Sequence, residues 1–143
     1  MLNSIVVIVN ASAGLGYCGG WSASLAEKFR SHGVEADILL AKNGEEMIAR
    51  ARQAVQDRVT VVVAGGGDGT INCVASQLVD SDTHLAVLAL GTLNHFAKDM
   101  NIPLDLDEAV ANAVTGKPLR FSFGRADREY KERWCNPVPV FKV

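Results

Sequence analysis

Asp68 is the residue of this sequence with the clearest capacity for chemistry, because it is the one acid in a run of small residues. Residues 65–70 read Gly-Gly-Gly-Asp-Gly-Thr. Glycines permit positive φ and close approach of a bulky anion, and the start of a following helix attracts phosphate. A carboxylate would repel that phosphate unless it binds an intervening divalent cation or ribose hydroxyls. The run predicts a phosphate loop, with Asp68 as a Mg²⁺ or active-site carboxylate and Thr70 as a helix cap or phosphate contact.

Two further loops of small or polar residues also follow apolar runs. Asn-Ala-Ser-Ala-Gly at 10–14 follows the run 5–9, and Gly-Thr-Leu-Asn at 91–94 follows the run 85–90. Residues 65–70 likewise follow the apolar run 59–64. Ligands of open α/β sheets bind beyond the carboxyl ends of the strands. If the strands are parallel, all three loops lie at one edge of the sheet.

The elements that must position these loops alternate along the chain. Continuous β-branched runs without polar alternation are typical of strands covered on both faces, and amphipathic stretches with capping-box patterns at Asn43 and Asp105 indicate helices. We expect strands at 5–9, 35–40, 59–64, 85–90 and 119–123, with helices between them. This alternation predicts an α/β domain, a three-layer Rossmann-like fold with a mostly parallel sheet, over residues 1–123.

The remaining residues, 124–143, differ in composition. Charged side chains crowd the first part of this segment, and Pro137 and Pro139 follow. Prolines lack the N–H that a central strand needs. We therefore expect a solvated, divergent tail that forms neither a helix nor a central strand.

Composition excludes several classes of protein. The chain has 143 residues, of which 48% are hydrophobic and 21% charged, with a formal net charge of −2. These values are typical of one globular domain, and without a basic block we expect no nucleic-acid partner. The apolar runs are too short to span a bilayer. Three widely spaced cysteines without a CxxC pair favour neither disulfides nor structural zinc, and we expect a cytoplasmic protein.

The phosphate loop matches neither standard nucleotide fingerprint. A Walker A motif needs a lysine next to the Ser or Thr, and the Rossmann GxGxxG is absent after the first predicted strand. Together, however, Gly-Gly-Gly-Asp-Gly-Thr at 65–70 and Gly-Thr-Leu-Asn-His-Phe-Ala at 91–97 resemble the diacylglycerol kinase catalytic domain family. The resemblance extends from about residue 3 to about residue 120. Residues 10–14 resemble the Asn-Pro-x-Ser-Gly after the family's first strand, with Ala11 in place of Pro.

The resemblance implies a nucleotide-binding domain similar to that of NAD kinase and phosphofructokinase. ATP would lie across the three loops, with Asp68 as the catalytic carboxylate near Mg²⁺ and the γ-phosphate, which is transferred to a lipid hydroxyl such as that of diacylglycerol. The implied nucleotide-binding residues are Asn10, Ser12, Ala41, Gly65, Gly66, Gly67, Asp68, Gly69, Thr70, Asn72, Gly91, Thr92 and Asn94.

The sequence also departs from the family's pattern. Cys73 replaces a frequent Glu, Ala41 replaces a frequent Thr, and His95 stands where Asp is commonest. The C-terminal β-rich domain that binds lipid in the family has no counterpart in the sequence. We therefore expect the lipid acceptor to bind through that missing part, with at most peripheral membrane contact. The sequence also leaves open whether the chain forms a homodimer.

Two other functions remain possible on the sequence. One is an NAD-kinase-like phosphotransferase, which shares the Gly-Gly-Asp-Gly-Thr feature. The second motif favours the lipid-kinase form over it, because Gly-Thr-Leu-Asn-His-Phe differs from the Asn-x-Gly-x-Leu-Gly of NAD kinases. The other is a non-catalytic domain that binds nucleotide or depends on a partner chain, which the short length, Ala41 and Cys73 favour.

Overall fold

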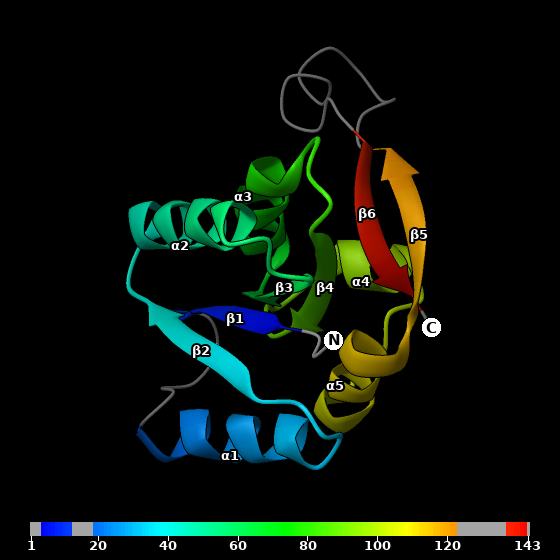
Figure 1. The fold of residues 1–143 in the computed structure, drawn as a ribbon. Coiled ribbons are helices and arrows are strands. Elements are labelled where there is room, and N and C mark those ends of the chain that lie inside the picture. The colour runs from blue at the N-terminus through cyan, green and yellow to red at the C-terminus, as the bar shows by residue number, and fades with distance from the viewer. Residues whose placement is uncertain (1–3, 13–18, 123–136, 143) are drawn as a thin grey trace.

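The structure is a computed structural model that describes residues 4–12, 19–122 and 137–142. Its helices and strands alternate along most of the chain (Figure 1). In chain order they are β1 (Ile5–Asn10), α1 (Gly19–Arg30), β2 (Ala36–Ala41), α2 (Gly44–Gln56), β3 (Val61–Gly66), α3 (Asp68–Leu78), β4 (His84–Ala89), α4 (His95–Asp99), α5 (Leu106–Thr115), β5 (Lys117–Ser122) and β6 (Pro137–Lys142).

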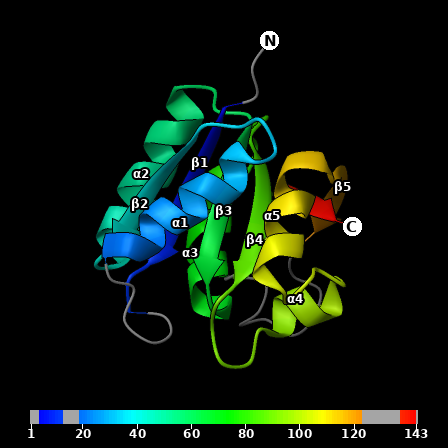
Figure 2. The same cartoon turned by 90° about the horizontal axis from the view of Figure 1, so that it is seen from below.

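The strands form one mostly parallel sheet in the order β2-β1-β3-β4-β6-β5. All neighbouring strands pair in parallel except β5 and β6, which are antiparallel. Helices α1 and α5 cover one face, and α2 and α3 cover the other (Figures 1 and 2). This arrangement confirms the predicted α/β class, the three layers and the mostly parallel sheet.

The core consists of two apolar layers that share the central strands. Alternate residues of β1, β3 and β4 point to opposite faces, and almost all of them are fully buried. On one face they pack against α2, α3 and Ala97 of α4. On the other they pack against Leu25 and Phe29 of α1 and against α5. Burial on both faces explains why these strands read as continuous apolar runs.

Both predicted capping residues are confirmed. The Asn43 side chain accepts a hydrogen bond from the Glu46 N–H at 2.9 Å, and Asp105 accepts one from the Glu108 N–H at 3.0 Å. The Glu46 carboxylate in turn accepts the Lys42 N–H at 2.8 Å, one residue before the position that a standard capping box uses.

The loop between β3 and α3 is shorter than the sequence predicts. Gly65 and Gly66 belong to β3, and α3 begins at Asp68, which leaves Gly67 as the connection between them. Gly67 has φ −88°, and Gly33 is the one glycine of the described part with positive φ. The glycines of the run therefore do not use the positive φ that glycine permits.

The expectation that the tail forms neither a helix nor a central strand is wrong for residues 137–142. They form β6, which lies between β4 and β5 in the sheet. β6 pairs along its whole length with β5, whereas its register with β4 joins only Leu85 to Val140. In a β-strand, the N–H groups of residues two apart point toward the same neighbouring strand. The two prolines of β6 therefore remove hydrogen-bond donors on one side of the strand only. The first part of the expected tail, up to residue 136, lies outside the described residues.

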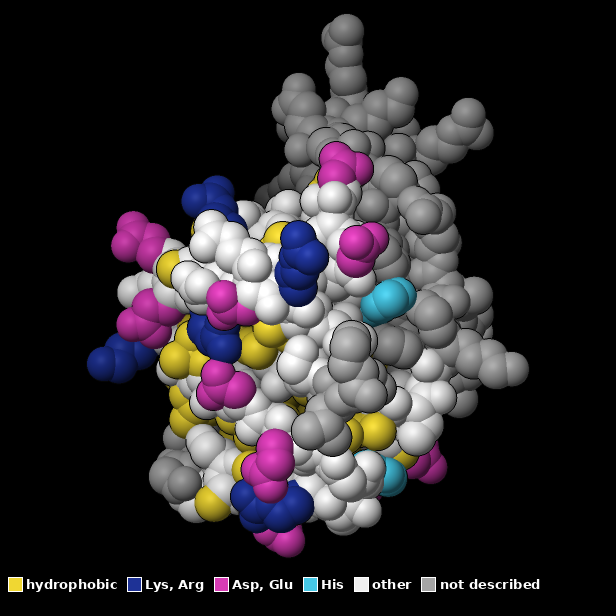
Figure 3. Space-filling view, in the orientation of Figure 1, with side chains coloured by type: hydrophobic (Ala, Val, Ile, Leu, Met, Phe, Trp, Pro, Cys, Tyr) yellow, Lys and Arg dark blue, Asp and Glu magenta, His cyan; other side chains and the backbone are white. Residues whose placement is uncertain are grey.

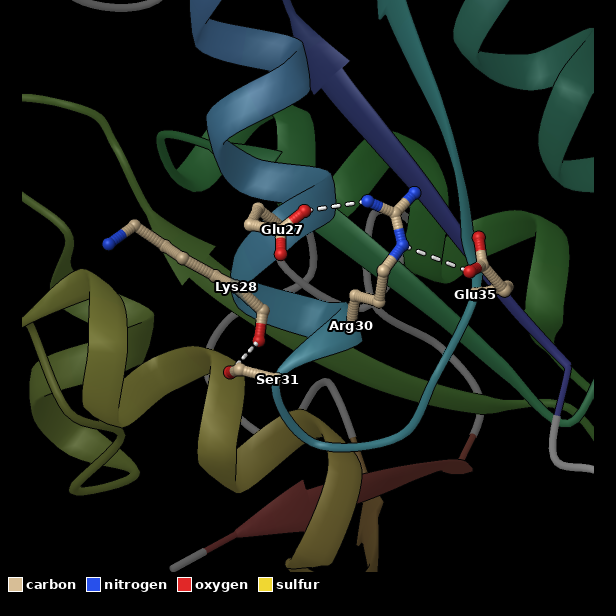
Figure 4. Close-up of polar contacts among 5 residues, drawn as sticks. All are labelled: Glu27, Lys28, Arg30, Ser31 and Glu35. Atoms are coloured by element: carbon tan, nitrogen blue, oxygen red, sulfur yellow. Dashed lines mark hydrogen bonds and ion pairs between the residues drawn. The ribbon is translucent and has the colours of Figure 1, made fainter.

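Arg30, the last residue of α1, forms two ion pairs. Arg30 donates to Glu27 at 2.6 Å and to Glu35, which precedes β2, at 3.0 Å (Figure 4). These hydrogen bonds, that to Glu35 first, raise the pKa of the Arg30 guanidinium. Because β2 begins directly after Glu35, this cluster lies at the amino edge of the sheet, opposite the edge where the strands end.

On the face shown in Figure 3, basic and acidic side chains of the described residues are interspersed.

Candidate nucleotide site

The ends of β1, β3 and β4 bring the three predicted loops together. Val9 is paired with Gly65, and Gly66 is paired with Ala89, so the strands end side by side. The Leu90 N–H donates to the Gly66 carbonyl at 3.0 Å, which extends this pairing into the third loop. The predicted common edge is confirmed for the described parts of the loops. Ala13 and Gly14 of the first loop lie outside those parts.

The glycines of these loops are required for close approach. A Cβ at Gly66 would lie 2.6 Å from the Thr70 hydroxyl oxygen, and one at Gly65 would lie 3.0 Å from a Val9 methyl. At Gly91 a Cβ would meet the backbone of Gly67. The second and third loops therefore touch without intervening side chains.

Asn10 joins the first loop to the second. Its side-chain N–H donates to the Thr70 hydroxyl oxygen at 3.2 Å, and its Oδ1 accepts the Ser12 N–H at 2.9 Å. Thr70 is 5% exposed and lies in the first turn of α3, whose N-cap is Gly67. The interpretation of Thr70 as the helix cap is therefore wrong, and its hydroxyl oxygen instead orders the end of β1.

Asn94 closes the third loop. It adopts left-handed backbone conformation with φ 53°, which Asn tolerates better than most residues. Its Oδ1 accepts the Gly91 N–H at 3.0 Å, and its Nδ2 donates to the Gly91 carbonyl at 2.9 Å. This pair of bonds makes residues 91–94 a tight turn that presents Thr92 and Leu93 to solvent, with Leu93 60% exposed.

Asp68 links the second and third loops. Its Oδ2 accepts the backbone N–H of His95 at 3.0 Å, and its Oδ1 accepts that of Phe96 at 2.9 Å. Both donors belong to the first turn of α4, which has no intrahelical acceptor for them. Sequence reasoning identified Asp68 and the second motif separately but missed this link, because no local pattern relates residues 27 and 28 positions apart.

The start of α3 is the part of the edge best suited to an anion. Its N-cap is Gly67, which has no side chain that could cap the first-turn N–H groups. Gly69 is exposed, and a Cβ there would meet nothing within 4 Å. Free N–H groups and the positive end of the helix dipole favour phosphate at such a position. The backbone around Gly69 therefore fits the phosphates of a nucleotide.

Three positions that the sequence analysis singles out lie in β2 and α3. Ala41 is fully buried, and its carbonyl accepts the Ala11 N–H at 2.8 Å, so any part of Ala41 in nucleotide binding would be indirect. Asn72 is half-buried, and its Oδ1 is buried without a hydrogen bond in the described part of the chain. Cys73 packs against the core, and burial raises the pKa of its thiol.

The described residues at this edge do not by themselves form a cluster that would hold a metal ion. Mg²⁺ prefers carboxylates, water and phosphate oxygens in octahedral geometry. Both Asp68 oxygens already accept backbone N–H groups. Within residues 4–12, 19–122 and 137–142, no three His, Cys, Asp or Glu side chains gather where they could hold a metal ion.

A solved structure of a similar protein superposes on this fold. A crystal structure of a diacylglycerol kinase from Bacillus anthracis strain Sterne superposes with a TM-score of 0.66 at 22% identity, over 82% of this chain and 44% of that one. No helix in the described part of the chain is long and apolar enough to cross a membrane.

Curated relatives are similar in sequence over a shorter span. The "probable lipid kinase YegS-like" of Yersinia pestis (strain Pestoides F) is 42% identical over 105 residues, which are 71% of this chain and 36% of that protein. The protein of the same name from Klebsiella pneumoniae (strain 342) is 35% identical over 100 residues, 68% of this chain and 34% of that protein. The chain thus spans about a third of the length of these relatives. Residues 4–126 match the diacylglycerol kinase catalytic domain, and the chain belongs to that family.

Proposed function

We propose that this chain is the ATP-binding part of a lipid kinase, which transfers the γ-phosphoryl group of ATP to a lipid hydroxyl such as that of diacylglycerol. In that reaction a bond forms between the lipid hydroxyl oxygen and the γ-phosphorus. The bond from the γ-phosphorus to the oxygen bridging it to the β-phosphate breaks and releases ADP, and the hydroxyl proton passes to water or a base. Such a reaction depends mainly on positioning and on neutralising charge.

One observation carries the proposal: three loops of a lipid-kinase family domain meet where α3 begins without a side-chain cap. The N–H groups around Gly69 would bind phosphate oxygens. Thr92, exposed on the turn that Asn94 closes, would contact the nucleotide, and so would Ser12, which is exposed in the first loop. Gly65, Gly66, Gly67, Gly91, Asn10, Thr70 and Asn72 would act by shaping the edge.

The described residues do not gather into a metal site, so we assign no step to a protein-bound metal. ATP in solution carries Mg²⁺ on its phosphates, and the ion would enter this site with the nucleotide. Since the chain spans about a third of its curated relatives, residues that bind the lipid acceptor need not lie within it. We therefore expect ATP binding to be the measurable activity of this chain alone.

Calorimetry with ATP, ADP and NAD tests the proposal. We expect ATP and ADP to bind the 143-residue chain and NAD to bind at least tenfold more weakly, which is a difference of about 1.4 kcal/mol. Arg30→Ala is the matched control, because Arg30 lies in the ion-pair cluster at the amino edge of the sheet; it should leave ATP affinity unchanged. No binding of ATP at millimolar concentration would contradict the proposal, and tighter binding of NAD would favour the NAD-kinase alternative.

Transfer of phosphate is tested separately. The chain is incubated with γ-labelled ATP and diacylglycerol in mixed micelles, and label in the lipid fraction is counted. We expect little label from this chain alone and full activity from a full-length protein in which the same domain is joined to the remaining two-thirds of a relative. If ATP binds but that fusion also fails to phosphorylate lipid, the non-catalytic alternative is supported.

A further inference from the structure

Asp68 occupies an unusual position for a residue expected to work on a ligand. It is the first residue of α3, yet both oxygens of its side chain accept backbone N–H groups of α4, from His95 and Phe96. The N-cap residue of α4, Asn94, makes no side-chain cap bond, because its side chain is bonded to Gly91 instead. Asp68 therefore supplies from another element the cap that α4 lacks.

The bonds of Asp68 are of a strong kind. Hydrogen bonds from backbone N–H to a carboxylate are charge-assisted, and they are about twice as strong as neutral ones. The acceptor also carries negative charge to a helix N-terminus, where the peptide dipoles favour it. The link is therefore well suited to fixing one loop against another.

The link joins a helix packed on the core to the proposed phosphate-binding turn. α4 is anchored in the core, where Ala97 is fully buried and the following Ile102 is 4% exposed. At the other end, Asp68 lies between Gly67 and Gly69, which form the start of α3. Because the Gly67 and Gly91 backbones touch beside the link, a change in α4 would displace both loops together.

We propose that Asp68 is a positioning residue: its carboxylate holds the second motif, residues 91–97, against the phosphate-binding turn, rather than binding Mg²⁺ itself. It acts on the nucleotide through the turn that Asn94 closes and through the first-turn N–H groups of α3, which their N-cap Gly67 leaves without a side-chain cap. The inference rests on the proposed nucleotide site for its functional consequence. The link between α3 and α4 can be tested without any nucleotide.

The first test needs only the 143-residue chain. First-turn amides of a helix normally exchange rapidly with solvent because they have no intrahelical acceptor. Amide exchange followed by nuclear magnetic resonance should show the His95 and Phe96 amides of the wild-type chain protected at least tenfold over the unfolded rate. Asp68→Asn keeps the shape but leaves one acceptor oxygen, so protection of one of the two should be lost. Asp105→Asn, a capping residue of α5, is the control and should leave both amides protected.

The second test separates positioning from metal binding. ATP affinity is measured for wild type and Asp68→Asn, once with excess Mg²⁺ and once with EDTA. Positioning predicts a loss of roughly tenfold, as for one charge-assisted hydrogen bond, of equal size in both conditions. A loss confined to Mg²⁺ would overturn the inference, and so would rapid exchange of both amides in wild type. If the wild-type chain binds no ATP, the proposed function fails, whereas protected amides would still establish the link.

Discussion

The Cα of Gly67 and the Cα of Gly91 lie so close that a Cβ added to Gly91 would stand 2.4 Å from the Gly67 Cα. Real Cβ atoms do not approach backbone this closely, and neither loop can shift freely because each continues a buried strand. The contact brings the turn after β3 against the turn after β4, so the two motifs form one surface.

Gly91→Ala should therefore destabilise the fold and weaken nucleotide binding together. Overpacking of this kind costs about 1–3 kcal/mol, and urea unfolding would measure it as a lower midpoint. Gly44→Ala is the control, because a Cβ there meets nothing within 4 Å and should leave the free energy of unfolding unchanged or higher. Unchanged stability in Gly91→Ala would show that the two turns can separate without cost.

Gly69→Ala should have the opposite effect on stability. Gly69 lies in the first turn of α3, and a Cβ there has open space. Ala favours a helix over Gly by up to about 1 kcal/mol, so the free energy of unfolding should stay level or rise. ATP affinity should nevertheless fall by roughly tenfold, because the methyl group occupies the approach of phosphate to the backbone.

A matched variant in the same helix controls for stability. Ser76→Ala replaces an exposed residue two turns further along α3 and should also raise helix stability by a few tenths up to about 0.5 kcal/mol. Its ATP affinity, measured by the same calorimetry, should equal that of wild type. If Gly69→Ala binds ATP as wild type does, the phosphates do not lie at the start of α3.

The sequence predicts most of the fold because its signals here are local. Strands buried on both faces read as unbroken apolar runs, and the capping residues Asn43 and Asp105 lie within three residues of the N–H groups that they bind. The common edge of the loops then follows from parallel pairing. Glycine carries no side-chain signal for a strand, and the predicted third strand therefore ends before Gly65 and Gly66, which in fact complete β3.

What the sequence does not predict depends on contacts between distant residues. The bonds from Asp68 to α4 span 27 and 28 positions, and the Asn10–Thr70 bond spans 60. The sequence predicts no strand at β6 on local grounds, since Pro137 and Pro139 are poor residues for a central strand. It is accommodated because it pairs fully with β5 and only at Val140 with β4. Tertiary pairing thus overrides the local preference.

The bond from Asn10 to Thr70 should order the first loop for nucleotide binding. Thr70→Val removes the hydroxyl acceptor and keeps the buried volume, at a cost of about 0.5–1.5 kcal/mol. Thr70→Ser keeps the acceptor and loses a buried methyl group, which costs a comparable amount, about 1 kcal/mol. We expect ATP affinity to fall in Thr70→Val but not in Thr70→Ser. Equal affinities in the two variants would mean that the Asn10 bond has no part in binding.

Cys73 should be a slow nucleophile despite its position one turn into α3. Burial disfavours the thiolate and raises the pKa of the thiol, so alkylation by iodoacetamide should need a higher pH in the folded chain than in the chain unfolded in urea. The sign for stability follows: as pH rises through the thiol pKa of the unfolded chain, that chain loses its proton first, and the free energy of unfolding falls. Peptide mass spectrometry would follow Cys73 separately from Cys18 and Cys135. Equal rates in folded and unfolded chains at neutral pH would contradict this prediction.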